Sequence, residues 1–229
     1  MRRLRSNRLQ TRAVATPYGD GRLVLARAAD PVATLLLSHG AGKGIDSADL
    51  VALADRLPSS GVSVALFEQP WVVAGRKVAS PPATLDVGLR AAAAALVAAP
   101  PLFVGGRSAG ARSAARCAFS LGAAGCLALS FPLHPPGRPE KSRLAELAAA
   151  SGAGVPTLVV QGERDTMGRP EEFPTDLAAT ELFVVADADH SLRMPARAAL
   201  STAEALEEIF VAVHAWILRT LVANQPGNQ

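Results

Sequence analysis

The sequence predicts an α/β fold in which helices cover both faces of a mostly parallel sheet. The chain has 229 residues, enough for one domain with a substantial core. Its residues are 49% hydrophobic and 19% charged, a balance that is typical of folded globular proteins. Short apolar runs alternate with alanine-rich helical stretches, as expected when helices serve as the crossovers that parallel strands need.

The first predicted element is an antiparallel hairpin with strands at residues 13–16 and 22–28. The segment between them, Pro-Tyr-Gly-Asp-Gly, has glycines that permit the positive φ angles of a turn. Residues 1–12 contain five arginines, which account for all of the chain's net charge of +3. Because no aromatic residues are interleaved with them, we expect a disordered, solvated tail rather than an arm that binds nucleic acid.

The remaining strands are expected to be buried on both faces, because each run is almost wholly apolar and too short for a good helix. The predicted strands cover residues 33–38, 62–67, 101–104, 126–131, 157–160 and 182–185. The predicted helices cover residues 47–57, 84–98, 108–121, 142–150 and 202–222. This order predicts a single domain over residues 13–223 and a C-terminal tail at residues 224–229.

Composition limits the function further. Cys117 and Cys126 lack metal-ligand spacing and are too few for a disulfide framework, so we expect buried, reduced thiols and no metal. Pro17 and Gly19 interrupt the chain before the apolar core of an export signal could form. The longest uncharged run, residues 117–137, contains glycines and three prolines, so we expect no membrane span. These features predict a cytoplasmic protein without a membrane partner.

The strongest signal for chemistry is the segment Leu-Phe-Val-Gly-Gly-Arg-Ser-Ala-Gly at residues 102–110. An apolar strand leads into G-x-S-x-G and then into a helix, which is the pattern of a nucleophile elbow. Such a sharp turn needs small residues two positions before and after the serine, here Gly106 and Gly110. The motif also occurs by chance in a chain rich in Gly and Ala, so the interpretation of Ser108 depends on its partners.

A nucleophilic serine needs a histidine that takes its proton and an acid that orients the histidine. In this architecture the chain order is serine, acid, histidine, and His190 is the histidine that can follow an acid at the end of a late strand. We predict Asp165 as the acid, because catalytic groups collect at the carboxyl ends of such strands. Glu163, Asp187 and Asp189 remain rivals, although the two aspartates are very close to the histidine in sequence.

A glycine-rich loop, His-Gly-Ala-Gly-Lys-Gly, follows the strand at residues 33–38. Such a loop can turn a backbone N–H, best assigned to Ala41, toward the serine, and the N–H of Ala109 is the expected second donor of an oxyanion hole. We expect His39 to brace this loop through hydrogen bonds. The loop fits neither G-x-G-x-x-G nor G-x-x-x-x-G-K-[ST], so nucleotide binding is disfavoured and no cofactor is predicted.

The motifs HGAG, GRSAG, GERD and DADHS, in this order at strand ends, resemble the α/β-hydrolase fold from the hairpin to the end of the chain. The segments VGGRSAG, FPLHPPGRPE and LVVQGERD are similar to one bacterial branch. Its members are relatives of the hydrolase-like domain shared by the third subunit of the nuclear NSL acetyltransferase complex and a testis-expressed protein, near the dienelactone hydrolases. The resemblance implies a three-layer α/β-hydrolase core.

Two features separate this chain from better-known hydrolases. Dienelactone hydrolases have a cysteine nucleophile, whereas this elbow presents Ser108, so their specific reaction is not implied. The ten residues at 132–141, between the predicted strand and helix, leave no room for a cap domain.

Four side chains are weaker candidates for substrate binding. Arg76 and Lys77, in the loop at residues 71–82, could attract an anionic group, and Arg107 beside the nucleophile could add to that field. His134, in the proline-rich turn, could line the pocket. Solvated charge explains the two loop cations better, and a structural histidine is at least as good an interpretation of His134.

The residues together predict a cytoplasmic serine hydrolase for ester or thioester bonds of small acyl substrates, present as a monomer or homodimer. Ser108 would attack the carbonyl, with His190 as base and then acid. Peptide hydrolysis would follow the same mechanism and stays open. The alternative is a catalytically silent hydrolase-like module that binds a partner protein, because the fold alone does not establish catalysis.

Overall fold

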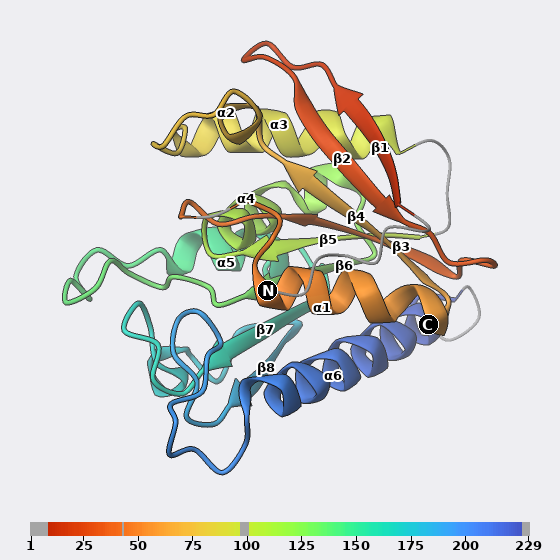
Figure 1. The fold of residues 1–229 in the computed structure, drawn as a ribbon. Helices are drawn as coiled ribbons and strands as arrows, with labels where there is room; N and C mark the ends of the chain where they lie inside the picture. The colour runs from red at the N-terminus through yellow and green to blue at the C-terminus, as the bar shows by residue number, and fades with distance from the viewer. Residues whose placement is uncertain (1–8, 43, 97–100, 226–229) are drawn as a thin grey trace.

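An eight-stranded sheet forms the centre of the computed structural model, which describes residues 9–42, 44–96 and 101–225 (Figure 1). The strand order is β1-β2-β4-β3-β5-β6-β7-β8. The strands are β1 (Leu9–Val14), β2 (Gly21–Ala26), β3 (Ala33–Ser38), β4 (Val62–Glu68), β5 (Leu102–Arg107), β6 (Gly125–Leu129), β7 (Thr157–Gly162) and β8 (Thr180–Val185). β2 pairs antiparallel with β1 and β4, and the strands from β4 to β8 pair in parallel.

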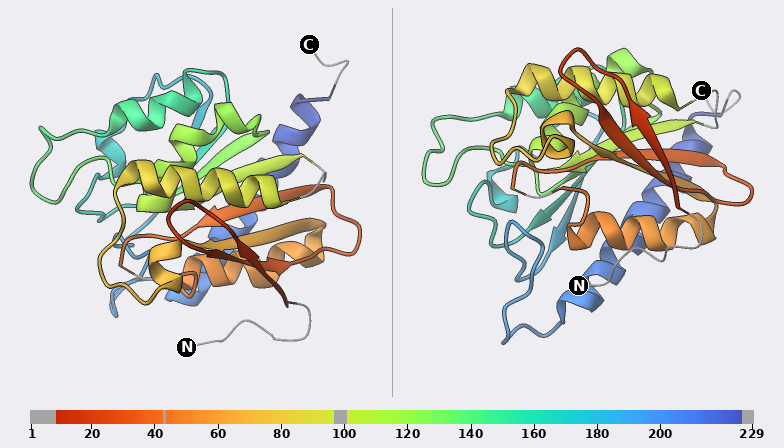
Figure 2. Two further views of the ribbon diagram at one scale, coloured as in Figure 1. Left: turned by 90° about the horizontal axis from the view of Figure 1, so that it is seen from above. Right: turned by 45° about the horizontal axis from the view of Figure 1, so that its top comes forward.

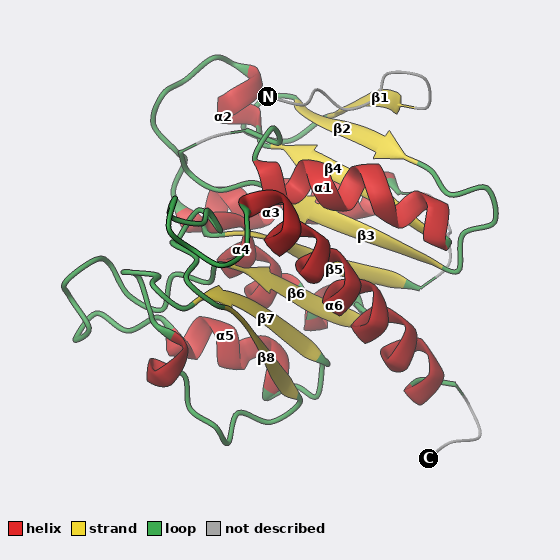
Figure 3. Ribbon diagram, turned by 60° about the horizontal axis from the view of Figure 1, so that its bottom comes forward, coloured by secondary structure: helices red, strands yellow, loops and turns green. Residues whose placement is uncertain are grey.

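Helices cover both faces of this sheet (Figures 1 and 2). The helices are α1 (Ala48–Arg56), α2 (Pro70–Val73), α3 (Pro82–Ala95), α4 (Ala109–Cys117), α5 (Leu144–Ser151) and α6 (Thr202–Ala223). Figure 3 shows α1 and α6 in front of the sheet, whereas α3, α4 and α5 cover its other face. The predicted fold class, three layers with a mostly parallel sheet and no cap domain, is therefore confirmed.

The core consists of two apolar clusters, one on each face of the sheet. Leu36 of β3 packs with α3, α4 and α5 side chains such as Leu89 and Leu147. Its neighbours Leu35 and Leu37 point to the other face, which α1 and α6 cover. Since successive side chains of a strand alternate between faces, a strand that is covered on both sides must be apolar throughout. Every residue of β3, β4, β6 and β7 is accordingly buried.

The long C-terminal helix α6 begins at a capping box. The Ser201 hydroxyl accepts a hydrogen bond from the N–H of Glu204, and the Glu204 carboxylate accepts one from the N–H of Ser201. These two bonds satisfy N–H groups that have no partner within a helix. The apolar side of α6 then buries Trp216, whose ring contacts Phe103 of β5 edge to face at 5.4 Å between centroids.

The N-terminal boundary was predicted too late in the chain. The first strand begins at Leu9, so residues 9–12 belong to the sheet, and the Arg12 guanidinium donates to the carbonyl of Ala95. Residues 1–8 of the predicted tail lie outside the described residues. Most of β1 is exposed because it lies at the edge of the sheet, and its mostly polar side chains therefore give no apolar signal.

Other boundaries differ in detail. β5 continues to Arg107, the predicted helix from residue 108 breaks into α4 and a short 3₁₀ turn at Phe119–Leu121, and α2 was not predicted. Residues 97–98, at the end of the helix predicted over 84–98, and residues 226–229 of the predicted C-terminal tail lie outside the described residues. Residues 130–143, which connect β6 to α5, contain neither helix nor strand. No helix in the described ranges has the length and hydropathy needed to cross a bilayer.

Candidate active site

Ser108 lies at the sharp turn between β5 and α4. Its backbone has φ 52° and ψ −111°, in a region that residues with a side chain rarely adopt. A contact with a neighbouring strand stabilises this strained conformation: the Ser108 N–H donates to the carbonyl of Leu129 in β6 at 2.9 Å. α4 follows at once, and the N–H of Arg112 donates to the Ser108 carbonyl. A strained residue fixed in this way presents its side chain in one direction.

The two glycines of the G-x-S-x-G motif are required by the backbone around them. A Cβ atom on Gly106 would lie 2.5 Å from the carbonyl oxygen of Ser38 and 2.6 Å from the carbonyl carbon of Gly110. A Cβ atom on Gly110 would overlap the same Ser38 oxygen. Both obstacles are main-chain atoms of β3 and α4, which cannot rotate away. The elbow can therefore form only with hydrogen atoms at these two positions.

The structure brings Ser108, His190 and Asp165 together in one hydrogen-bonded chain. Nε2 of His190 lies 3.1 Å from Oγ of Ser108, and Nδ1 of His190 lies 2.7 Å from Oδ2 of Asp165. A carboxylate can only accept, so the proton belongs on Nδ1, and Nε2 is left to accept from the serine hydroxyl. This is the arrangement that a general base needs.

The carboxylate of Asp165 is fully buried and held by further donors. The side-chain amide of Gln161 donates to Oδ2 at 2.9 Å, and the N–H of Met167 donates to Oδ1 at 2.8 Å. The Gln161 amide is itself fixed by the carbonyl oxygens of Phe131 and Gly168. Gln161 was not predicted, although a glutamine inside an otherwise apolar strand is a signal that could have identified it.

Two of the rival acids bond backbone groups of the loop that carries His190. Glu163 accepts the N–H of Asp187, and Asp189 accepts the N–H groups of Ser191 and Arg193. Asp189 therefore shapes the loop that carries His190 rather than contacting its ring. The choice of Asp165 over these residues agrees with the geometry.

The loop of His190 packs directly on the end of β7. A Cβ atom on Gly162 would lie 2.6 Å from the carbonyl oxygen of Ala188 and 2.7 Å from that of Asp189. Two residues of the loop, Asp187 and Leu192, have positive φ angles of 57° and 52°. The loop is thus tightly bent and held against the strand that leads to Asp165.

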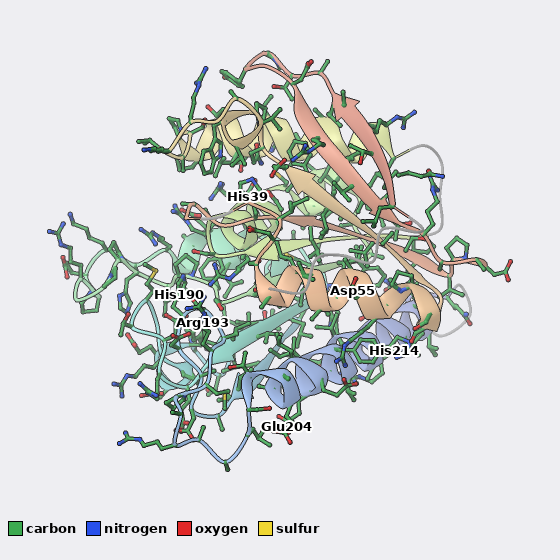
Figure 4. The ribbon with its side chains drawn as sticks, in the orientation of Figure 1. His39, Asp55, His190, Arg193, Glu204 and His214 are labelled. Atoms are coloured by element: carbon green, nitrogen blue, oxygen red, sulfur yellow. The ribbon has the colours of Figure 1, made fainter. Side chains whose placement is uncertain are left out.

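His39 braces the glycine-rich loop after β3, as predicted. Its Nδ1 lies 2.8 Å from the carbonyl oxygen of Gly40, and its Nε2 accepts the N–H of Gln69 at 3.0 Å. Because one ring nitrogen faces an acceptor and the other a donor, the imidazole is neutral with the proton on Nδ1. Figure 4 shows His39 and His190 toward the same end of the molecule, whereas His214 lies on α6.

The loop that His39 holds lies against the nucleophile. A Cβ atom on Gly40 would lie 3.4 Å from Cβ of Ser108. Ala41 follows Gly40 and is exposed, and Ala109 is the first residue of α4. An oxyanion hole made by the N–H groups of Ala41 and Ala109 stays a prediction.

Two of the side chains predicted to bind substrate have structural partners. Nη2 of Arg107 donates to the carbonyl of His190 at 2.9 Å, and its Nε lies 3.1 Å from Oδ2 of Asp49. The ring of His134 contacts the carbonyl of Pro135 and the carboxylate of Glu172, both at 2.8 Å. These contacts show how the fold holds both side chains, and substrate binding by either residue stays a prediction.

The two other candidates, Arg76 and Lys77, are exposed in the loop after α2. In the described part of the chain, no hydrogen bond or ion pair joins either side chain to Ser108, His190 or Asp165. The structure also contains, among the described residues, no group of three or more His, Cys, Asp or Glu side chains that could hold a metal ion.

His134 and Glu172, which contact each other, both have shifted pKa values. The hydrogen bond to the Pro135 carbonyl raises the pKa of His134, and Glu172 raises it further. The N–H of Arg169 lowers the pKa of Glu172, as does His134. His134 and Glu172 thus form a charged pair that joins the segment after β6 to the segment after Asp165.

A family model described as "Alpha/beta hydrolase domain" matches residues 31–218. No curated protein sequence matches this chain significantly. Several solved structures have the same fold. A serine hydrolase without a lid from Xanthomonas campestris is 18% identical, with 95% of this chain and 97% of that chain covered and a TM-score of 0.71.

Two further structures are similar over almost their whole lengths. A dienelactone hydrolase from Anabaena variabilis is 16% identical, with 93% of this chain and 97% of that chain covered and a TM-score of 0.72. Est1E from Butyrivibrio proteoclasticus is 13% identical, with 93% and 99% covered and a TM-score of 0.70. At these identities the similarity shows a shared fold.

Proposed function

The chain belongs to the family of alpha/beta hydrolase domains, and from this premise we propose that it is a serine hydrolase that cleaves ester or thioester bonds of small acyl substrates. The observation that carries the proposal is the hydrogen-bonded chain from Ser108 through His190 to Asp165. Each of the three side chains has the bonding partner that its role requires. The names of the solved structures, which include a serine hydrolase and a dienelactone hydrolase, support the same class of reaction.

The proposed reaction begins with the Ser108 hydroxyl. Its oxygen attacks the carbonyl carbon of the substrate while Nε2 of His190 takes its proton, and the carbonyl oxygen becomes an oxyanion. The N–H groups of Ala41 and Ala109 would stabilise that oxyanion. The tetrahedral intermediate then expels the alcohol or thiol, which leaves with the proton from His190, and an acyl-serine ester remains.

Water completes the cycle by the same steps. His190 takes a proton from a water molecule, whose oxygen attacks the acyl carbon, and Ser108 leaves with that proton. Asp165 keeps the proton on Nδ1 throughout and stabilises the imidazolium that forms twice in each cycle. Gln161 and the N–H of Met167 hold the carboxylate in place, so Asp165 does not have to be reoriented during the reaction.

The exposure of His190 supports a substrate that reaches the site from solvent. Residues 130–143 contain neither helix nor strand, so this part of the chain adds no cap domain. The side chain of His190 is 22% exposed, which places the base at the surface. We propose a cytoplasmic monomer or homodimer that belongs to the NSL-related bacterial branch of the family.

A fluorophosphonate probe tests the proposal directly, because it reacts only with an activated serine. We expect the wild-type protein to be labelled at Ser108 and to hydrolyse members of a panel of esters and thioesters with short acyl chains. Ser108→Ala should lose the label and lower kcat by roughly 10⁴- to 10⁶-fold. Ser120→Ala is the matched control, since Ser120 is exposed in the 3₁₀ turn that follows α4, and its hydroxyl donates to the carbonyl of Cys117.

The alternative of a silent binding module predicts a different result. A folded wild-type protein that neither takes the label nor hydrolyses any member of the panel would contradict the proposed function. Equal rates for the wild type and His190→Ala on every substrate would contradict the mechanism.

A further inference from the structure

We propose that Arg107 is a positioning residue of this site, with Asp49 as its counter-ion. Its guanidinium fixes the backbone of His190 and thereby the place from which the imidazole faces Ser108. The inference rests on the proposed function, because it concerns the residue that serves as the base. Loss of Arg107 should therefore lower kcat and leave substrate binding unchanged.

The contacts of Arg107 reach three separate segments. Nη2 donates to the main-chain carbonyl of His190 at 2.9 Å, and Nε lies 3.1 Å from Oδ2 of Asp49 in α1. The contact with Asp49 is an ion pair without the alignment of a hydrogen bond. A Cβ atom on Gly40 would lie 3.4 Å from Nη1, so the guanidinium also lies beside the loop after β3.

The ion pair between Arg107 and Asp49 is buried, which keeps the guanidinium in one position. The side chain of Arg107 is 12% exposed and that of Asp49 is 1% exposed, so each charge depends on the other for compensation. Asp49 lies in the first turn of α1, where the helix dipole favours a negative charge. A guanidinium in this place has little freedom to turn toward a substrate, because moving it would leave Asp49 buried without its counter-ion.

The loop of His190 needs such a support. Asp187 and Leu192, on either side of His190, have positive φ angles, and strained loops keep their shape only when the surroundings determine it. Asp165 holds the imidazole ring at Nδ1, and Arg107 holds the main chain of the same residue. Since Arg107 also precedes Ser108, one residue links the backbone of the nucleophile to the backbone of the base.

Arg116 offers a matched control for a purely structural arginine. It is similarly buried, with a side chain that is 20% exposed, and forms ion pairs with Asp86 and Glu146 between α3, α4 and α5. None of its hydrogen bonds reaches Ser108, Asp165 or His190. Arg116→Gln should therefore lower the stability of the fold and leave kcat and KM within a few-fold of the wild type.

The decisive variant is Arg107→Met/Asp49→Asn, which removes both charges and so leaves no unpaired charge in the core. We expect kcat to fall roughly 10- to 100-fold with KM within a few-fold, because displacement of a catalytic group by about 1 Å costs rate rather than affinity. Arg107→Lys, which keeps a donor for the His190 carbonyl, should recover part of that loss. The Asp49→Asn variant alone should keep more activity than the double variant, since it retains that donor.

The outcomes separate the roles of Arg107. A double variant with wild-type kcat would contradict the proposal, and so would a rise of KM at unchanged kcat, which would make Arg107 a substrate ligand. If the wild type proves inactive, the proposed function fails, and the Nδ1 proton of His190 still tests the positioning role by NMR. That resonance, identified by its loss in His190→Ala, should shift or broaden in the double variant and not in Arg116→Gln; an unchanged resonance would contradict the proposal.

Discussion

Asp165 and His190 come from the ends of adjacent strands and meet through a hydrogen bond of 2.7 Å between Oδ2 and Nδ1. The aspartate is fully buried, whereas the histidine side chain is 22% exposed. The bond therefore connects the interior of the protein to the surface at which a substrate would arrive. It also determines which nitrogen of the imidazole carries the proton.

Asp165→Asn should lower kcat by roughly 10³- to 10⁴-fold, because an amide can donate to Nδ1 and so favours the wrong tautomer. The fold should persist, since asparagine has nearly the shape of aspartate. Glu163→Gln is the control, because Glu163 bonds the N–H of Asp187 and not the ring. Ester hydrolysis by both variants measures the difference. Comparable losses in the two variants would contradict the assignment of the acid.

Gly110→Ala should destabilise the protein by about 1–3 kcal/mol or more, because the added methyl group overlaps the Ser38 carbonyl and the core cannot make room for it. Activity should fall as well, since the overlap displaces α4 and with it the elbow. Gly42→Ala is the control for stability, because nothing lies within 4 Å of the added Cβ atom. Urea unfolding of both variants gives the comparison, and equal midpoints would show that the elbow tolerates a side chain there.

The pair of His134 and Glu172 should make stability depend on pH. His134 has a raised pKa, so its contribution is present below its unfolded pKa near 6.5 and is lost as the pH rises through the folded value. Glu172 has a lowered pKa, so its contribution is present above its unfolded pKa near 4.5 and is lost as the pH falls through the folded value. Both contributions are therefore present near pH 5.5.

His134→Gln should cost about 1 kcal/mol near pH 5.5 and less near pH 8.5, with the small size reflecting the partly exposed Glu172. Denaturant unfolding at the two pH values measures this difference. A double-mutant cycle with Glu172→Gln separates the pair from other effects of the histidine. A coupling that is no larger at pH 5.5 than at pH 8.5 would contradict the ion pair.

The two cysteines should be inert in the folded protein. Burial raises the pKa of the Cys117 thiol to about 11 and that of Cys126 to about 12, and the thiolate is the reactive form. We expect no reaction with a disulfide reagent at pH 8 until the protein unfolds, when both thiols should react. Rapid reaction of a thiol in the native protein would mean that the layer between α4 and β6 opens. The thiols then serve as a measure of that opening.

The parallel part of the sheet could be predicted because burial on both faces leaves a simple trace in the sequence. The residues of β3, for example, are all covered, so the strand appears as an unbroken apolar run. The edge strand β1 leaves no such trace, since backbone hydrogen bonds to β2 hold it and its side chains are mostly exposed. Pairing through the backbone is independent of side-chain type, which is why residues 9–12 were missed.

The same distinction applies to the site. Ser108, Asp165 and His190 could be identified because parallel strands place their carboxyl ends along one edge, so position at a strand end already implies proximity. The partners of Arg107 and His134 could not, since the direction of a long side chain depends on neighbours such as Asp49 and Glu172 from distant segments. The local sequence shows which hydrogen-bond donors and acceptors a side chain has. Only the packed fold determines which of them have a partner.

Residues 130–143, between β6 and α5, contain neither helix nor strand, and this bears on how long an acyl group would stay on Ser108. A connection that adds no helix or strand over the site would leave the acyl group accessible to water from the moment it forms. Other alcohols or amines would have to compete with that water without any help from an enclosed, dry chamber. If Ser108 is acylated as proposed, hydrolysis by solvent water would therefore prevail over transfer of the acyl group to another alcohol or amine.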